Sequence, residues 1–247
     1  MTVLVARWVN RQQGLMTRWN VIRKETVDRI GSFLALNYPD VILNSRYWWR
    51  LALKRVVDFV GSTLLIVAFA PVMLLIAAAI KLTSRGPVFY TQERVGRSGD
   101  LFNMFKFRSM VHDAEAATGP VWARHSAEDP RVTPVGRFLR VTHLDELPQL
   151  INVWKGEMSL VGPRPERPCF VDQLNKEIPG YGYRLYVKPG MTGLAQVYYR
   201  YDRTLADVKR KLRFDVLYIK RMCLMLDVRI LAATFLVMVT GKGVGLR

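Results

Sequence analysis

The strongest hydrophobic pattern along the chain is an uncharged run from Phe59 to Ile80, FVGSTLLIVAFAPVMLLIAAAI. As a straight helix, these 22 residues would be about 33 Å long, which is enough to cross a hydrocarbon core of about 30 Å. Soluble proteins rarely bury so long and so uniformly apolar a helix. The run therefore predicts a membrane segment.

Pro71 lies near the middle of this run and predicts a kink, because proline removes a backbone hydrogen bond and clashes with the preceding turn. Residues 36–55 and 81–100 carry four Lys or Arg each, so the positive-inside rule favours neither orientation. We therefore expect a re-entrant hairpin over residues 51–82 that returns to the cytoplasmic face. A kinked helix that spans the membrane once is the alternative, since proline is tolerated in spanning helices.

Residues 1–50 form a basic and weakly amphipathic extension. Apolar residues between Leu15 and Phe33 fall near one helical stripe, and most of the Lys and Arg lie off it. This pattern suits a helix that lies on an anionic bilayer surface. A helix packed on a protein partner would explain the same stripe.

Residues 83–247 have the patterns of one compact domain. Two strand-like stretches, Val88–Val95 and Leu101–Ser109, flank the turn residues GRSGD and predict a β-hairpin. Helical patterns follow at Glu146–Lys155, Pro168–Glu177 and Thr204–Arg221. The apolar stretch 228–240 is too short to span a membrane, so we expect it to be interfacial or packed. The predicted fold is α+β and mainly helical, with the membrane hairpin joined to a cytoplasmic domain that carries interfacial amphipathic helices.

Composition and charge narrow the classes of partner. Half of the residues are apolar, which excludes a disordered chain. The 37 Lys and Arg against 20 Asp and Glu give a net charge of +17, which predicts a nucleic acid, a phosphate-bearing substrate or an anionic membrane surface as partner. Two cysteines cannot form a disulfide framework, and without a secretory signal we expect a cytoplasm-facing location. The absence of GxGxxG, Walker and zinc-finger patterns argues against an NTPase or a nucleic-acid reader.

The acidic pair Asp145-Glu146 is the most suggestive candidate for chemistry. Because Pro148 fits only the first turn of a helix, we expect a helix that begins near Asp145. Both carboxylates would then lie at its positive end, where the dipole favours their ionised form and free N–H groups can receive phosphate oxygens. An ionised aspartate beside a phosphorus atom is a competent nucleophile, and Glu146 could hold a divalent ion. An N-cap with a helix-dipole partner would explain the pair equally simply.

Several cations accompany the acidic pair. Lys106 and Arg108 lie two residues apart in the second predicted strand, so both should face one side and could grip a diphosphate. Arg164 lies between two prolines in GPRP, which restricts its backbone. Arg140 adds positive charge near the acidic pair. Together with the acids, these cations match what phosphoryl transfer needs: a nucleophile, a metal and charge neutralisation. A solvated strand face and a rigid turn are the simpler interpretations of the two segments.

Several short motifs, including the acidic pair and the cations beside it, follow one another along the chain. In chain order they are KR..D (54–58), the Pro-kinked apolar run, GPVFYTQERVGR (86–97), KFRSM (106–110), LDELPQL.NV.KGEMSLVGPRP (144–165) and KPGMTGLAQV (188–197). In this order the motifs resemble those of the bacterial sugar transferases, the monotopic phosphoglycosyl transferases that begin glycoconjugate assembly on a polyprenol carrier. The resemblance covers residues 50–247.

The resemblance implies an activity. Members of this family transfer a phospho-sugar from a UDP-sugar to undecaprenyl phosphate and release UMP, the first membrane step of exopolysaccharide or other glycoconjugate synthesis. By alignment, Asp145 would attack the β-phosphorus and carry the phospho-sugar covalently, and Glu146 would bind Mg²⁺. The implied substrate-binding residues are Lys106, Arg108, Arg140, Arg164 and Asp215. The implied location is the cytoplasmic face of the bacterial inner membrane, with membrane lipids as partners.

Two other functions remain open at this point. A non-catalytic basic module that binds anionic lipid or a partner enzyme would explain the charge and the apolar run, but it leaves the acidic pair beside GPRP unexplained. A nucleic-acid binder accounts for little beyond the net charge, so we expect no nucleic-acid partner. The sequence is compatible with a homodimer, and it does not reveal which sugar is used.

Overall fold

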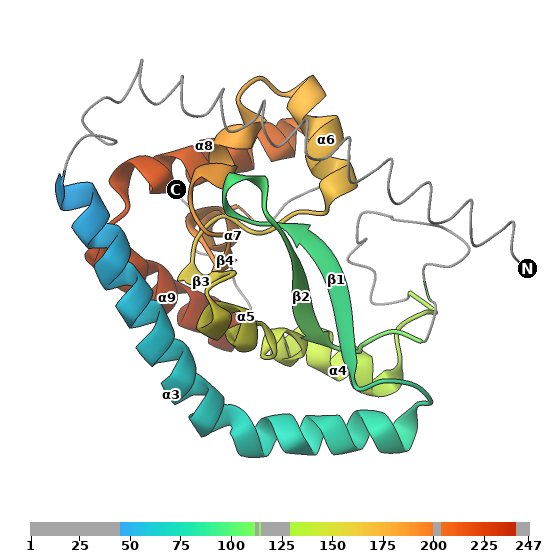
Figure 1. Cartoon of the computed structure of the whole chain (residues 1–247). Helices are drawn as coiled ribbons and strands as arrows, with labels where there is room; N and C mark the ends of the chain where they lie inside the picture. The colour runs from blue at the N-terminus through green and yellow to red at the C-terminus, as the bar shows by residue number, and fades with distance from the viewer. Residues whose placement is uncertain (1–44, 112–113, 115–128, 200–203, 241–247) are drawn as a thin grey trace, which may run out of the picture.

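The computed structural model describes residues 45–111, 114, 129–199 and 204–240 (Figure 1). The amphipathic stripe expected between Leu15 and Phe33 lies outside these residues. A long helix, α3 (Ser45–Thr83), runs along one side of a domain built from two small sheets and a set of helices. The other elements are β1 (Phe89–Val95), β2 (Leu101–Phe107), α4 (Pro134–Thr142), α5 (Gln149–Lys155), β3 (Ser159–Val161), α6 (Pro168–Glu177), β4 (Gly190–Thr192), α7 (Leu194–Tyr198), α8 (Leu205–Arg221) and α9 (Leu224–Thr240), with short 3₁₀ turns η1 (Arg97–Gly99), η2 (Leu144–Glu146) and η3 (Tyr181–Tyr186).

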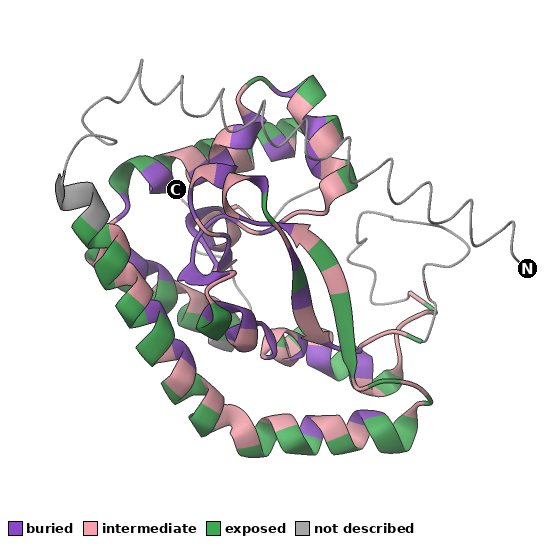
Figure 2. Ribbon diagram, in the orientation of Figure 1, coloured by how far each residue is buried: buried purple, intermediate pink, exposed green. Residues whose placement is uncertain are grey.

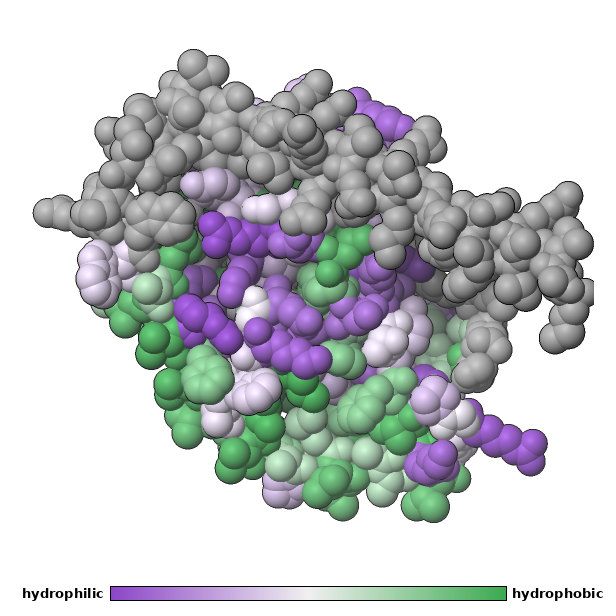
Figure 3. All heavy atoms as spheres, in the orientation of Figure 1, coloured by the Kyte–Doolittle hydropathy of each residue, from purple (hydrophilic) through white to green (hydrophobic). Residues whose placement is uncertain are grey.

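Helix α3 is one continuous helix of 39 residues with Pro71 inside it. Figure 1 shows that it bends into two arms, and proline is a common cause of such a bend because it breaks the backbone hydrogen-bond ladder. Among the described residues, α3 alone is long and apolar enough to cross a membrane, and only 11% of its most apolar window is buried. A core helix of a soluble protein would be mostly buried. Figures 2 and 3 show the exposed, hydrophobic surface along α3.

The KR..D motif fastens α3 to the rest of the protein. The Lys54 ammonium lies 2.6 Å from the carboxylate of Asp227 in α9. Arg55 donates hydrogen bonds of 2.8 Å to two carbonyl groups at the end of α5. The buried carboxylate of Asp58 accepts two hydrogen bonds of 3.0 Å from β3, one from a hydroxyl and one from a backbone N–H. Three charged side chains on one arm of α3 therefore fix its position against three elements of the domain.

The predicted β-hairpin is confirmed. Strands β1 and β2 pair antiparallel, with Phe89 opposite Phe107 and Val95 opposite Leu101. The second sheet was not predicted, and it consists of the short parallel strands β3 and β4. A Cβ atom added at Gly190, the first residue of β4, would lie 2.0 Å from the backbone nitrogen of Gly162. This glycine therefore permits the close approach of two backbone segments.

The helices near the end of the chain match their patterns closely. Helix α6 has the predicted bounds, and α8 begins one residue after Thr204, whose side chain forms a capping box with Asp207. The apolar stretch 228–240 lies within α9, where Ile230 is buried and Phe235 is 67% exposed. Helix α9 is therefore packed along one side and open along another. Helix α4 was not predicted.

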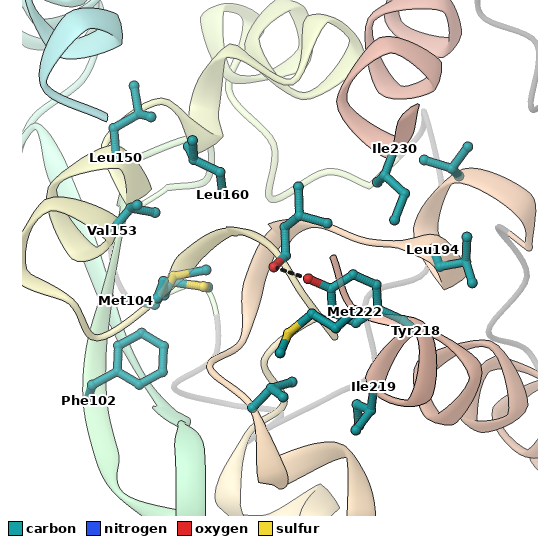
Figure 4. Close-up of a cluster of buried hydrophobic side chains, with 14 residues drawn as sticks. Phe102, Met104, Leu150, Val153, Leu160, Leu194, Tyr218, Ile219, Met222 and Ile230 are labelled. Carbon is teal, nitrogen blue, oxygen red and sulfur yellow. Dashed lines mark hydrogen bonds between the residues drawn. The ribbon is translucent and has the colours of Figure 1, made fainter. Parts of the chain in front are cut away.

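The largest hydrophobic cluster joins α5, α8, α9 and both sheets (Figure 4). Tyr218 of α8 is fully buried in it, and its hydroxyl donates a hydrogen bond of 3.1 Å to the carbonyl oxygen of Val161, drawn as a dashed line in Figure 4. The same hydroxyl lies 2.8 Å from Asp227, the residue that pairs with Lys54 of α3. The core and the anchor of α3 therefore share one hydrogen-bond network.

Candidate active site

One cavity of about 630 Å³ lies between the β1–β2 hairpin, α4, α6 and α8. This volume is within the range of about 300–1,000 Å³ that is usual for small-molecule sites. Six of the seven residues predicted from the sequence line the cavity, namely Lys106, Arg108, Arg140, Asp145, Arg164 and Asp215. The seventh, Glu146, contacts two of these six.

The acidic pair lies in a tighter turn than expected. Helix α4 ends at Thr142, its C-cap His143 has a left-handed φ of 58°, and the 3₁₀ turn η2 follows directly. Helix α5 begins only at Gln149, with Pro148 as its N-cap, so the predicted helix start near Asp145 was wrong. The N–H groups of Glu146 and Leu147 already bond to carbonyl oxygens within the turn, at 3.2 and 3.3 Å. These two groups are therefore not free to receive phosphate oxygens.

Asp145 faces the cavity with an uncommitted carboxylate. The residue is 8% exposed, and it makes no hydrogen bond or ion pair with any residue that the structure describes. Burial raises the pKa of its carboxyl group above the ordinary range, and the nearby Lys106 only partly opposes this. The expectation that a helix dipole would favour the ionised form is therefore reversed, because burial outweighs the local positive charge. A carboxylate with few partners and a raised pKa is a stronger base, which suits a nucleophile.

Glu146 has the opposite environment. One of its oxygens, Oε1, lies 2.7 Å from the Lys106 ammonium and 2.7 Å from the Arg164 guanidinium. Burial by itself would raise the pKa of Glu146, but Arg164 and Lys106 outweigh it and hold the pKa well below its usual range. Glu146 therefore keeps two cations in place beside Asp145.

The donor set limits how a metal could bind. Within the described residues, no group of three or more His, Cys, Asp or Glu side chains could hold a metal ion. Mg²⁺ commonly binds proteins through one or two carboxylates, together with substrate phosphates and water. The neighbouring carboxylates of Asp145 and Glu146 fit a Mg²⁺ ion that takes its other ligands from a phosphate group and water. With the described residues alone, they do not complete a site for an ion held only by protein groups.

Two arginines missed by the sequence analysis hold the GPRPE loop (residues 162–166). The Nη2 atom of Arg184, in η3, donates to the carbonyl oxygen of Arg164 at 2.7 Å and forms an ion pair of 3.2 Å with Asp215. Arg94 of β1 donates to the next carbonyl of the loop at 3.1 Å. Arg184 is isolated in the segment YGYRLYV, so no spacing pattern could have identified it. Asp215 lines the cavity and forms its ion pair with this buried arginine.

Helices α6 and α8 and the turn η3 contribute apolar side chains to the cavity, namely Phe170, Leu174, Tyr181, Val208 and Leu212. The same elements also contribute Arg184, Lys211 and Asp215. Asp145 and the four cations predicted from the sequence come from β2 and the residue after it, α4, η2 and the GPRPE loop. The cavity therefore offers both a polar part for phosphate groups and an apolar part for a planar or hydrophobic moiety.

Comparison with known proteins shows the family. The chain matches the bacterial sugar transferase family over residues 49–241, and it belongs to this family. It is 45% identical over 191 residues to the UDP-N-acetylgalactosamine-undecaprenyl-phosphate N-acetylgalactosaminephosphotransferase of Aeromonas hydrophila, an alignment that covers 77% of this chain and 44% of that protein.

Other relatives carry related names. The chain is 45% identical over 166 residues to a putative undecaprenyl-phosphate N-acetylgalactosaminyl 1-phosphate transferase of Bacillus subtilis, covering 67% of this chain and 87% of that protein. It is 42% identical over 184 residues to a UDP-glucose:undecaprenyl-phosphate glucose-1-phosphate transferase of Escherichia coli, covering 74% of this chain and 39% of that protein. The chain thus spans less than half the length of the Aeromonas and Escherichia relatives. Because the named sugars differ at similar identity, the likeness does not choose among them.

Proposed function

We propose that this chain transfers a phospho-sugar from a UDP-sugar to undecaprenyl phosphate and releases UMP. The names of the relatives support the substrate classes. The observation that carries the proposal for this chain is the environment of Asp145. Its carboxylate has no partner among the described residues, and it faces a cavity lined by several arginines and two lysines. A non-catalytic basic module would not need a reactive carboxylate held open among cations.

The reaction proceeds through two displacements at one aspartate. In the first, an oxygen of the Asp145 carboxylate attacks the β-phosphorus of the UDP-sugar, the bond between that phosphorus and the bridging oxygen breaks, and UMP leaves. Lys106 and Arg164, both fixed by Glu146, neutralise charge on the diphosphate. In the second, an oxygen of the acceptor phosphate attacks the same phosphorus, and the carboxylate of Asp145 is released. The raised pKa of Asp145 favours the attack once the carboxylate has lost its proton.

Mg²⁺ is part of the proposal. Glu146 and Asp145 would hold it together with oxygens of the diphosphate, as the donor set allows. When bound, the ion would supply positive charge against the phosphates. Glu146 would then have two tasks, because it also fixes Lys106 and Arg164.

The bent helix α3 would place this site at the cytoplasmic face of the inner membrane. Its exposed apolar surface suits a hydrocarbon environment, and the bend in this proline-containing helix suits a re-entrant path in which both ends stay on one side. Apolar residues of α9 such as Val228 and Phe235 are exposed as well, which suits an interfacial position. An acceptor whose phosphate lies at the headgroup level could then reach the cavity.

The direct test is release of UMP from a panel of UDP-sugars in the presence of Mg²⁺ and polyprenyl phosphate. We expect one or a few sugars to give UMP, and the variant Asp145→Asn to give none. Glu177→Gln removes a carboxylate from the exposed end of α6 and should leave the activity unchanged. Absence of UMP with every sugar would contradict the proposal and favour a non-catalytic membrane-surface module.

A further inference from the structure

Arg108 is a buried cation whose hydrogen-bonding capacity is only partly used. It lies just after β2, lines the cavity and is 5% exposed. Its Nη2 atom donates to the carbonyl oxygen of Ser84 at 3.0 Å and to the Ser84 hydroxyl at 2.6 Å. Its Nε and Nη1 atoms are buried and have no hydrogen-bond partner among the described residues. A buried guanidinium with unmet donors is costly, so these two donors are suited to bind an anion.

Arg140 of α4 adds a second unmet donor to the same cavity. Its Nη1 atom is also buried and without a hydrogen-bond partner among the described residues. Asp129 is close enough to Arg140 to interact with its charge. That carboxylate, however, is already paired with Arg131 at 2.8 Å. The donors of Arg108 and Arg140 therefore remain available to a ligand.

The position of Arg108 at the end of the apolar helix favours one class of ligand. Ser84 directly follows the last residue of α3, and its N–H still bonds to the carbonyl oxygen of Ile80 at 3.0 Å. Arg108 is thus tied to the end of the apolar helix. Lys106 and Arg164, in contrast, are both bound to Glu146 beside Asp145. Of the four cations predicted from the sequence, Lys106 and Arg164 are thus held by Glu146, and Arg108 is held where the apolar helix ends.

We propose that Arg108 and Arg140 form a second anion subsite, which receives the phosphate monoester of the lipid-linked acceptor, while Lys106 and Arg164 serve the diphosphate of the nucleotide sugar. The inference rests on the proposed function, and it divides cations that the resemblance assigns together to the diphosphate. In the second displacement, the acceptor phosphate bound to Arg108 supplies the attacking oxygen. A new P–O bond forms to the phospho-sugar, and the P–O bond to Asp145 breaks.

The two half-reactions can be measured separately. With UDP-sugar and no acceptor, the release of UMP stops after about one equivalent per enzyme and reports the first displacement. Adding polyprenyl phosphate then removes the phospho-sugar from the enzyme, and the rate of this discharge reports the second displacement. We expect Arg108→Gln to keep the rate and amplitude of UMP release within about threefold of wild type. The discharge should slow by about 100-fold, the scale expected when two hydrogen bonds to a charged group are lost.

Controls make the outcome specific. Arg137→Gln removes a cation from the exposed side of the same helix α4, outside the cavity, and should change neither half-reaction. Arg108→Lys keeps the charge and should restore part of the discharge rate. The amplitude of UMP release counts the folded enzyme in every preparation, so misfolding cannot imitate a selective loss. Arg140→Gln should show the same selectivity as Arg108→Gln, with a smaller effect.

Inorganic phosphate separates a lipid-specific site from a general phosphate site. If the subsite binds the phosphate group itself, millimolar inorganic phosphate should slow the discharge of wild-type enzyme and leave the release of UMP unchanged. Equal loss of both half-reactions in Arg108→Gln would overturn the subsite, because Arg108 would then serve the diphosphate. An unchanged discharge would overturn it as well. A wild-type enzyme that releases no UMP at all would instead contradict the proposed function.

Discussion

Replacing Asp145 by asparagine should make the protein inactive and at the same time more stable. Asp145 is a buried carboxylate without a hydrogen-bond partner in the described structure, and burial raises its pKa. At neutral pH its ionisation therefore opposes folding. Leaving such a group unsatisfied costs about 1–3 kcal/mol, and we take the lower end, about 1 kcal/mol, because the carboxylate faces a cavity that water can enter. For a chain of this size, that gain raises the melting temperature by about 2–4 °C.

The neighbouring variant Glu146→Gln should have the opposite effect. Its carboxylate holds Lys106 and Arg164 at 2.7 Å each, and their side chains retain 18% and 35% exposure. Breaking a fully buried pair costs about 3–5 kcal/mol, and this residual exposure reduces the cost to about 2 kcal/mol. The melting temperature should therefore fall by about 4–8 °C. Two adjacent substitutions that each remove one negative charge are thus expected to change the melting temperature in opposite directions.

The assay is thermal unfolding in detergent, followed by the intrinsic fluorescence of the tryptophans. The pH dependence supplies a second check. The folded state binds a proton at Asp145 more tightly than the unfolded state does, so the stability gained by Asp145→Asn should shrink as the pH falls through the raised pKa of the carboxyl group. A melting temperature that falls in both variants would refute this account of the acidic pair.

Three further predictions concern the charged groups of the site and of the anchor. The rate of the acceptor-free UMP burst should fall as the pH drops through the raised pKa of Asp145, because only the ionised form attacks; a flat rate across this range would contradict the nucleophile. Arg184→Lys should lower kcat at least tenfold with a small change in the melting temperature, since a lysine cannot hold the Arg164 carbonyl and Asp215 together in the same way; kinetics and unfolding measured on one preparation test this. Lys54→Met should destabilise the protein by about 2 kcal/mol, because it leaves the Asp227 carboxylate without its cation; the double variant with Asp227→Asn should recover part of the loss in denaturant unfolding.

Local sequence patterns predicted much of the fold. The alternation in β1 and β2, the capping residue Thr204 and the proline that opens α6 are short-range signals, and each defined an element within one or two residues. The parallel strands β3 and β4 depend on a pairing across about 30 residues and on backbone contact at Gly190, which no local pattern reveals. Helix α4 was missed although Pro134 and its cap Thr133 mark its start. Pro71 predicted a bend, and the bend lies within a single continuous helix.

In the site, residue types could be predicted from the sequence, but the environment of each residue could not. The acids and cations could be selected from the sequence, and the cavity brings six of them together. The pKa values of these groups could not be predicted from the sequence, because they depend on burial and on neighbouring charges in the fold. Asp145 and Glu146 are neighbours in one turn, yet their pKa values shift in opposite directions. The positioning arginine Arg184 was missed because its role arises from tertiary contacts with a loop carbonyl and Asp215.

The central claim, that Asp145 carries the phospho-sugar, is tested most directly by intact-mass measurement of the enzyme after incubation with its UDP-sugar and without acceptor. We predict a mass increase equal to one sugar phosphate, located on the peptide that contains Asp145, lost on addition of polyprenyl phosphate and absent in Asp145→Asn. UMP formation and glycolipid product without any such adduct, or an adduct that persists in Asp145→Asn, would contradict it.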